Sequence, residues 1–237
     1  MTLVTSTGPT DGKGRRVRST GPAGSGSGRL VGSAGASAST AGSHPTLHLV
    51  RHGQSDWNLQ HRVQGQQNAP ELTDRGRAQS ATAAEWLAGR KPVLLLTSDL
   101  TRAIQSAEII GSAIGLVPIV TPLLREQALG SLEGLSNREA MARLDGVDLT
   151  DAATRYGGGE SRDDVSARIR LLLTTPPISD HGPADEIVMV SHGDTIRIAV
   201  ADLLGEDLMQ TPWRRIENGS VTTISSHQDN PSVPNAR

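Results

Sequence analysis

Short runs of consecutive apolar residues recur along the chain, and polar or charged segments separate them. Residues 47–50, 93–96 and 187–190 are such runs, and each is typical of a strand that is buried on both faces. Residues 119–120 and 221–224 predict two further short strands, the second at an edge of the sheet. Continuous apolar strands of this kind favour a mostly parallel sheet.

Between these runs, apolar residues return with the period of an amphipathic helix. The clearest helix spans residues 73–90, with Thr73 as its N-cap. Three more helices are predicted: one after Asp99 that ends near residue 114, one over residues 160–173, and one after His192 that ends near residue 204. This alternation predicts an α/β fold, a three-layer sandwich whose mostly parallel central sheet is covered by helices on both faces.

The two ends of the chain depart from this pattern. Residues 1–44 are rich in Gly, Ser, Thr and Ala, so they cannot bury enough surface to offset the entropy of ordering. We interpret them as a disordered tail; Arg15, Arg16 and Arg18 leave open a targeting segment, a partner-binding tail or a start codon placed too early. The polar residues 227–237 are expected to be flexible. One folded domain is therefore predicted over residues 45–226.

Composition and charge exclude several classes of function. The chain has 237 residues, 23 of them Lys or Arg and 25 Asp or Glu, so it offers no electrostatic footprint for nucleic acid or an anionic membrane. Cysteine is absent, which excludes a disulfide framework, a thiolate nucleophile and a cysteine metal site. No apolar run approaches the roughly 18 residues of a membrane span. We expect a cytoplasmic protein with no nucleic-acid or membrane partner.

Candidate chemistry lies where the buried strands end. Two of them run into a histidine followed by a glycine, at His52-Gly53 and His192-Gly193, and a third is followed by Arg102 in the first turn of a helix. Ligands of an open α/β sheet bind beyond the carboxyl ends of its parallel strands. Arg51, His52, Arg102 and His192 should therefore converge, and two guanidiniums beside two imidazoles form a pocket for an anion such as phosphate.

Five motifs surround these junctions: residues 49–58 (Leu-Val-Arg-His-Gly-Gln-Ser-Asp-Trp-Asn), residues 98–107, Leu124-Arg125-Glu126 with Gly130 and Glu133-Gly134 after it, Gly158-Gly159-Glu160-Ser161, and Val190-Ser191-His192-Gly193. In this order they closely resemble the signature of the histidine phosphatase superfamily, also called the phosphoglycerate mutase-like family. The resemblance covers about residues 46–224 and implies a phosphoglycerate mutase-like fold.

The resemblance also implies a role for each matching residue. His52 corresponds to the nucleophile that attacks phosphorus, and Glu126 to the general acid. The clamp on the phosphoryl oxygens corresponds to Arg51, Arg102 and His192. Further substrate-binding positions are Asn58, the covering loop at Gln64 and Gly65, and Gly193 beside the second histidine. Because cationic side chains neutralise the phosphoryl charge, no cofactor and no metal are expected.

Each of these residues also has a purely structural interpretation. His52 and His192 could cap strand ends, and Arg102 could pair with Asp99 or Glu108. Glu133 competes with Glu126 for the part of the acid. We assign a structural or solvent-facing role to Asp56, Glu160 and Asp194, and a packing role to Trp57. All five predicted catalytic residues are present within their motifs, which favours an enzyme. The alternative is a non-catalytic module that has lost activity and binds phosphate or phosphopeptides.

The superfamily contains both phosphatases and mutases, and one spacing separates them. A mutase must exclude water while the substrate reorients, and cofactor-dependent mutases carry a sizeable insertion between the acid and the second histidine. His192 follows Glu126 by only 66 positions, which favours hydrolysis. We expect a phosphomonoesterase acting on a small phosphoester, a sugar phosphate or a phosphoglycerate derivative. We expect about residues 130–159 to determine substrate specificity. The sequence is compatible with a homodimer.

Overall fold

A central sheet of six strands organises the protein. The computed structural model describes residues 2–6, 44–209 and 214–225. The strands lie in the order β1-β6-β2-β5-β3-β4, and β6 alone runs in the direction opposite to the other five. Their bounds are β1 Thr2–Ser6, β2 Thr46–Arg51, β3 Leu94–Thr97, β4 Ile119–Val120, β5 Glu186–Ser191 and β6 Val221–Ser225. The mostly parallel sheet of the prediction is confirmed.

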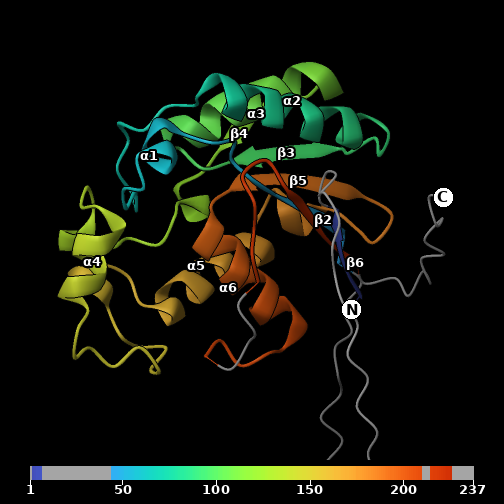
Figure 1. Ribbon diagram of the computed structural model, residues 1–237. Helices are drawn as coiled ribbons and strands as arrows, with labels where there is room; N and C mark the ends of the chain where they lie inside the picture. Colours follow the sequence, from blue (N-terminus) through green and yellow to red (C-terminus); the bar gives the residue numbers. More distant parts are fainter. Residues whose placement is uncertain (1, 7–43, 210–213, 226–237) are drawn as a thin grey trace, which may run out of the picture.

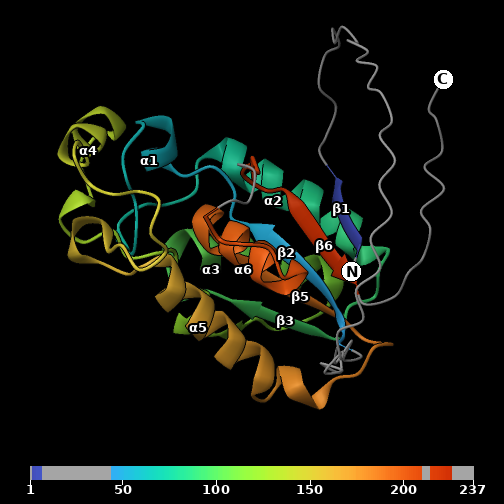
Figure 2. The same cartoon turned by 90° about the horizontal axis from the view of Figure 1, so that it is seen from below.

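Helices cover both faces of the sheet and make the three layers. One face carries α2 and α3, and the other carries α5 and α6, while α1 and α4 lie beyond the carboxyl ends of the strands (Figures 1 and 2). The helix bounds are α1 Asp56–Leu59, α2 Asp74–Ala88, α3 Thr101–Ile114, α4 Asn137–Arg143, α5 Arg162–Thr174 and α6 Gly193–Leu204. Short 3-10 turns at Pro122–Leu124, Gly130–Leu132, Tyr156–Gly158 and Ile178–Asp180 complete the described elements.

The strands alternate their side chains between two apolar cores. Leu47 and Leu49 of β2 pack in the core under α5 and α6, and Val50 packs in the core under α2 and α3. Both cores are aliphatic, as a chain without Phe requires. A third, smaller cluster joins α4 to Tyr156. The sheet is therefore sealed on both faces, and polar chemistry is confined to the strand ends.

The first strand and β6 differ from the sequence prediction. Thr2–Ser6 pairs with β6, so disorder does not hold for these five residues, and β6 lies inside the sheet instead of at its edge. An open edge offers unpaired N–H and C=O groups, and the run Thr-Leu-Val-Thr, with three β-branched residues, suits a strand. The predictions for residues 7–43 and 227–237 lie outside the described residues. Among the described helices, none is long and apolar enough to cross a membrane.

The backbone of Gly53, directly after His52, lies very close to the backbone of α2. A Cβ atom on Gly53 would lie 2.1 Å from the carbonyl oxygen of Gly76 in α2. We therefore expect Gly53→Ala to lower the free energy of unfolding by roughly 3 kcal/mol, because backbone must move to relieve the clash. Gly89→Ala is the control: its φ is −72° and its nearest contact is 3.7 Å. That variant should stay within about 1 kcal/mol of wild type in urea titrations; equal losses in both would contradict this view of Gly53.

Candidate active site

The three central strands bring the two histidines together. β2 and β5 are adjacent and parallel, with Arg51 opposite Ser191, and β3 pairs with the other side of β5. The rings of His52 and His192, which follow these strands, have centroids 5.1 Å apart. Both side chains are buried. The predicted convergence of the two strand-His-Gly junctions is confirmed.

The backbone sets the tautomer of His52. Its Nδ1 lies 2.7 Å from the carbonyl oxygen of Gly53, an acceptor only, so Nδ1 carries the proton and donates it to that bond. Nε2 is then unprotonated and holds its lone pair for a ligand. The Gly53 N–H is held in turn by the Ser106 hydroxyl at 3.1 Å, which anchors the turn. His52 is thus oriented as a neutral imidazole with a nucleophilic Nε2.

Burial and neighbouring cations keep both imidazoles neutral. Desolvation, then the charges of Arg102 and Arg51, hold the pKa of His52 well below its ordinary value. Desolvation and Arg102 likewise hold the pKa of His192 well below its ordinary value. His192 therefore becomes a cation only when an anion such as a phosphoryl group binds beside it.

The two arginines are fixed by backbone carbonyls. Arg102 is fully buried and donates to the oxygens of Gly65 at 2.8 Å and Gln67 at 2.9 Å. Arg51 donates to the oxygen of Ile216 at 2.6 Å. Burial lowers the pKa of Arg102 to about 10, which still leaves it charged at neutral pH. The alternative pairing of Arg102 with Asp99 is wrong, because Asp99 pairs with Arg125 at 2.6 Å.

Unsatisfied nitrogens point to an oxygen-rich ligand. Among the residues that the structure describes, three buried side-chain nitrogens have no hydrogen-bond partner: Nε of Arg51, Nε of Arg102 and Nδ1 of His192. All three belong to residues predicted as the phosphate clamp. A buried polar group without a partner costs about 1–3 kcal/mol, so these positions favour a ligand that supplies acceptor oxygens.

The carboxylate of Glu126 lies at the start of α6, one turn from His192. Its Oε1 accepts from the Thr195 N–H at 3.0 Å and the Thr195 hydroxyl at 3.2 Å, and Oε2 accepts from the Asp194 N–H at 3.3 Å. The structure places Glu133 elsewhere. Its carboxylate accepts from the backbone of Gln66 and Leu129 and ties two loops together.

The remaining predicted substrate-binding residues contact other protein groups and hold parts of the site in place. Oδ1 of Asn58 accepts from the Ser55 N–H at 3.0 Å and closes the capping box of α1. Gln64 accepts from the Ser55 hydroxyl at 2.9 Å, and Gly65 has a φ of +46°, which lets its carbonyl hold Arg102. A Cβ on Gly193 would lie 3.4 Å from Arg51, so this glycine leaves room for the guanidinium.

Sequence reasoning missed several residues that position the site. Ser98 Oγ lies 2.9 Å from His192 Nε2, and Asn218 donates to the carbonyl of His52 at 3.1 Å. The structural role predicted for Glu160 is confirmed, because its carboxylate accepts from Arg168 and from the Ala128 N–H and braces the segment beside Glu126. Ser98 immediately follows β3 and opens the second motif, so the sequence held two signals for it.

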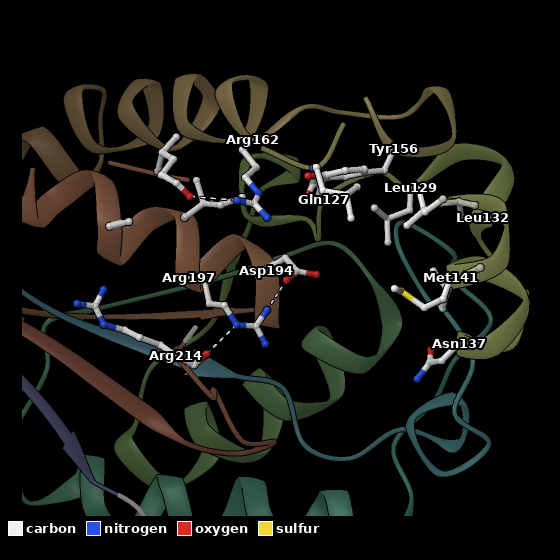
Figure 3. Close-up of a pocket in the computed structure, with 17 residues that line it drawn as sticks. Gln127, Leu129, Leu132, Asn137, Met141, Tyr156, Arg162, Asp194, Arg197 and Arg214 are labelled. Atoms are coloured by element: carbon white, nitrogen blue, oxygen red, sulfur yellow. Dashed lines mark hydrogen bonds and ion pairs between the residues drawn. The ribbon is translucent and has the colours of Figure 1, made fainter. Parts of the chain in front are cut away.

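A cavity of about 680 Å³ has residues of α4 and α6 among its walls (Figure 3). Two of the residues that line it, Gln127 and Asp194, donate backbone N–H groups to the Glu126 carboxylate. Further walls come from α4, α6 and the Tyr156 turn. The stretch 130–159, predicted to set specificity, thus lines the space next to Glu126.

The buried histidines predict an acid-sensitive fold. Desolvation holds the pKa of His48, His52 and His192 below the ordinary value. These three imidazoles therefore stay unprotonated in the folded protein at pH values where the same residues take up protons in the unfolded chain. Stability is then fully present above about pH 6.5 and is lost as pH falls below it, by roughly 1.4 kcal/mol per pH unit for each histidine. Urea titrations between about pH 7 and 5 should show that the free energy of unfolding falls less steeply with decreasing pH in His52→Gln than in wild type. Equal pH dependence in the two proteins would contradict the account.

Comparison with known proteins identifies relatives. The profile of the histidine phosphatase superfamily (branch 1) matches residues 47–236. The chain is 40% identical over 191 residues to the glucosyl-3-phosphoglycerate phosphatase of Mycobacterium tuberculosis (strain ATCC 25618 / H37Rv), covering 76% of this chain and 85% of the relative. It is 33% identical to the probable phosphoglycerate mutase GpmB of Cronobacter sakazakii (strain ATCC BAA-894), covering 77% of this chain and 85% of that protein. The native structure of mycobacterial glucosyl-3-phosphoglycerate phosphatase Rv2419c superposes with a TM-score of 0.62 at 38% identity, covering 70% of this chain and 82% of that one.

Proposed function

Because the chain belongs to the histidine phosphatase superfamily (branch 1) and is a phosphomonoesterase of that superfamily, we propose that it hydrolyses a small phosphorylated metabolite through a phosphohistidine on His52. One observation carries the proposal. The unprotonated Nε2 of His52 lies among three buried nitrogens without protein partners, on Arg51, Arg102 and His192. A phosphoryl group supplies the oxygens that these nitrogens can bind and the phosphorus that Nε2 can attack.

In the first step, His52 Nε2 attacks phosphorus and the bond to the ester oxygen breaks. The electron pair of that bond goes to the alcohol oxygen, which takes a proton from the carboxyl group of Glu126. Arg51, Arg102 and a protonated His192 stabilise the charge that spreads over the equatorial oxygens. The phosphoryl dianion favours a cationic His192 and so opposes the burial and the arginine charges that lower the pKa of His192 in the unliganded site.

In the second step, water attacks the phosphohistidine. The Glu126 carboxylate takes a proton from that water, and Nε2 of His52 leaves phosphorus with the electron pair of the P–N bond. Inorganic phosphate is released and His52 returns to the tautomer held by the Gly53 carbonyl. One ester and one water thus give one alcohol and one phosphate, and the same carboxyl group serves as acid and then as base.

Two observations bear on whether the protein is a phosphatase or a mutase. Relatives named glucosyl-3-phosphoglycerate phosphatase match at 38–40% identity, and relatives named probable phosphoglycerate mutase GpmB at 31–33%. His192 follows Glu126 by 66 positions, without the long insertion that keeps water from a mutase site. These observations support hydrolysis of a phosphorylated sugar or phosphoglycerate derivative. Mutase transfer remains the alternative, and cytoplasmic location and homodimer formation stay predictions.

The proposal is tested by phosphate release from a panel of phosphoesters, including glucosyl-3-phosphoglycerate, with EDTA present. We expect release from at least one ester and little conversion of 3-phosphoglycerate to 2-phosphoglycerate. Isomerisation with little phosphate release would establish the mutase. Binding of phosphate without turnover of any ester would point to a non-catalytic module.

A further inference from the structure

The second histidine of the site is held by a buried hydroxyl group. Oγ of Ser98 lies 2.9 Å from Nε2 of His192, and both side chains are buried. The sheet fixes this distance, because the Ser98 N–H donates at 3.0 Å to the carbonyl of Val190, which lies two residues before His192. Thr97 and Val190 are register partners in β3 and β5. Ser98 is thus built into the strand ends that carry the predicted phosphate clamp.

The partners of the Ser98 hydroxyl show in which direction its proton points. A serine hydroxyl has one proton to donate and two lone pairs that can accept. Its oxygen accepts from the Leu100 N–H at 3.3 Å. Among the described contacts of this hydroxyl, Nε2 of His192 is the remaining partner, and it is the one that can accept a proton. Because a buried hydroxyl without an acceptor is unfavourable, we expect the hydroxyl to donate and Nε2 to keep its lone pair.

This hydrogen bond determines the tautomer of His192. Burial, then the charge of Arg102, holds the pKa of His192 well below its ordinary value, so the ring is neutral in the unliganded site. In a neutral imidazole, one ring nitrogen carries the proton and the other accepts. With Nε2 as the acceptor, the proton lies on Nδ1, which is buried and has no hydrogen-bond partner among the described residues. The Nδ1–H group can therefore donate to an oxygen of a ligand.

The same tautomer gives His52 the opposite capacity. The Gly53 carbonyl binds the Nδ1 proton of His52, so the nitrogen left for a ligand is Nε2 with its lone pair. Ser98 binds the lone pair of Nε2 on His192, so the nitrogen left there is Nδ1 with its proton. The two rings are 5.1 Å apart and both are buried, so burial alone does not distinguish them. A carbonyl beside one ring and a hydroxyl beside the other make one histidine a nucleophile and the other a donor.

A hydroxyl is also suited to the change of charge on His192 during the reaction. When the phosphoryl dianion favours the cationic ring, the added proton binds to Nε2. The Ser98 hydroxyl can then rotate about its C–O bond and accept from the new N–H, so that no heavy atom has to move. A backbone N–H could not accept from the cation, and a carbonyl could not donate to the neutral ring. The hydroxyl thus holds the ring in one orientation through both protonation states.

We propose that Ser98 is a positioning residue that keeps a proton on Nδ1 of His192 and directs this proton toward a phosphoryl oxygen. The inference rests on the proposed phosphatase function and adds the group that makes His192 a donor instead of a second nucleophile. Without the hydroxyl, Nε2 can carry the proton of the neutral ring. Nδ1 then presents a lone pair to the phosphoryl oxygens, and this contact is repulsive.

Nitrogen NMR of the full-length protein with isotope-labelled histidine measures the tautomer directly and needs no turnover. His192→Gln identifies the signals of His192 by their loss. In wild type, Nδ1 of His192 should carry a proton and Nε2 should not, and Nδ1 should stay protonated when inorganic phosphate is added. In Ser98→Ala the proton should be shared between the two nitrogens, whereas Ser98→Thr retains a hydroxyl and should retain the wild-type pattern. A wild-type ring with its proton on Nε2 and none on Nδ1 would overturn the inference.

Phosphate release then measures what the hydroxyl contributes to catalysis. Ser98→Ala should lower kcat for alkyl phosphates roughly 10–100-fold, less than the loss of a whole donor group because the imidazole remains, and Ser98→Thr should stay within about threefold of wild type. Ser80→Ala is the matched control, because it removes a buried serine hydroxyl that donates to the Gly76 carbonyl within α2, and its kcat should equal that of wild type. Wild-type kcat in folded Ser98→Ala would overturn the positioning role and leave the phosphatase function standing. If the expected tautomer is found but wild type releases phosphate from no ester, the proposed phosphatase function is wrong and the tautomer assignment stands.

Discussion

Replacing His52 with alanine should lower turnover of every phosphoester by at least about four orders of magnitude. Nε2 of His52 is the only atom in the proposal that bonds to phosphorus. Nε2 of His192 is held by Ser98 and its Nδ1 is assigned to a phosphoryl oxygen, while the arginines are cations without a lone pair to donate. The measurement is steady-state phosphate release, with the folded state of the variant checked by urea unfolding.

His48→Gln is the matched control for His52→Ala. His48, in β2, is likewise a buried histidine whose pKa is lowered by burial, but its ring binds Glu186 and Thr223 away from the site. This variant is expected to lose stability while its kcat stays within about threefold of wild type. If His52→Ala kept more than a tenth of wild-type turnover, the nucleophile would have to be another group.

The second large effect is expected from Glu126→Gln, and it depends on the leaving group. For alkyl phosphates the rate should fall roughly 10²–10³-fold, because the departing alkoxide loses its proton donor. For p-nitrophenyl phosphate the first step should change little, because p-nitrophenolate leaves without a proton. Hydrolysis of the phosphohistidine also loses its base, so this variant should show a burst of p-nitrophenol followed by a slow steady state.

Glu133→Gln provides the comparison for Glu126→Gln. Its carboxylate holds the backbone of Gln66 and Leu129, so its loss should loosen the covering loop and affect both esters alike. If Glu133→Gln, and not Glu126→Gln, showed the burst and the dependence on the leaving group, Glu133 would be the general acid and Glu126 the structural residue.

Much of this site could be predicted from the chain, because its residues follow directly from strand ends. His52 and His192 each come one residue after a buried apolar strand, and parallel strands end at a common edge. Arg102 lies in the first turn of α3, which begins soon after β3 ends, so its position also follows from a strand end. These placements require no knowledge of side-chain packing, which is why sequence pattern and motif agree with the structure.

Other features depend on contacts between distant segments and leave no pattern in the sequence. Asn218 reaches the His52 carbonyl across 166 positions, and nothing about an Asn-Gly pair near the end of the chain indicates that bond. Arg162 looks like any charged residue at a helix start until the structure shows its guanidinium donating to the Leu208 carbonyl and the Met209 sulfur. The cavity beside Glu126 likewise forms where α4, α6 and the loops between them meet, which no single stretch of sequence indicates.

A trapped phosphoenzyme tests the central claim most directly. The enzyme is mixed with substrate, quenched in base, in which phosphohistidine is stable, and digested for mass spectrometry. Glu126→Gln reacting with p-nitrophenyl phosphate is the best source, because hydrolysis of its intermediate is slowed. The account predicts one added phosphoryl group on the peptide that contains His52, and none in His52→Ala. Phosphate on another residue, or a burst of p-nitrophenol with no labelled peptide, would contradict it.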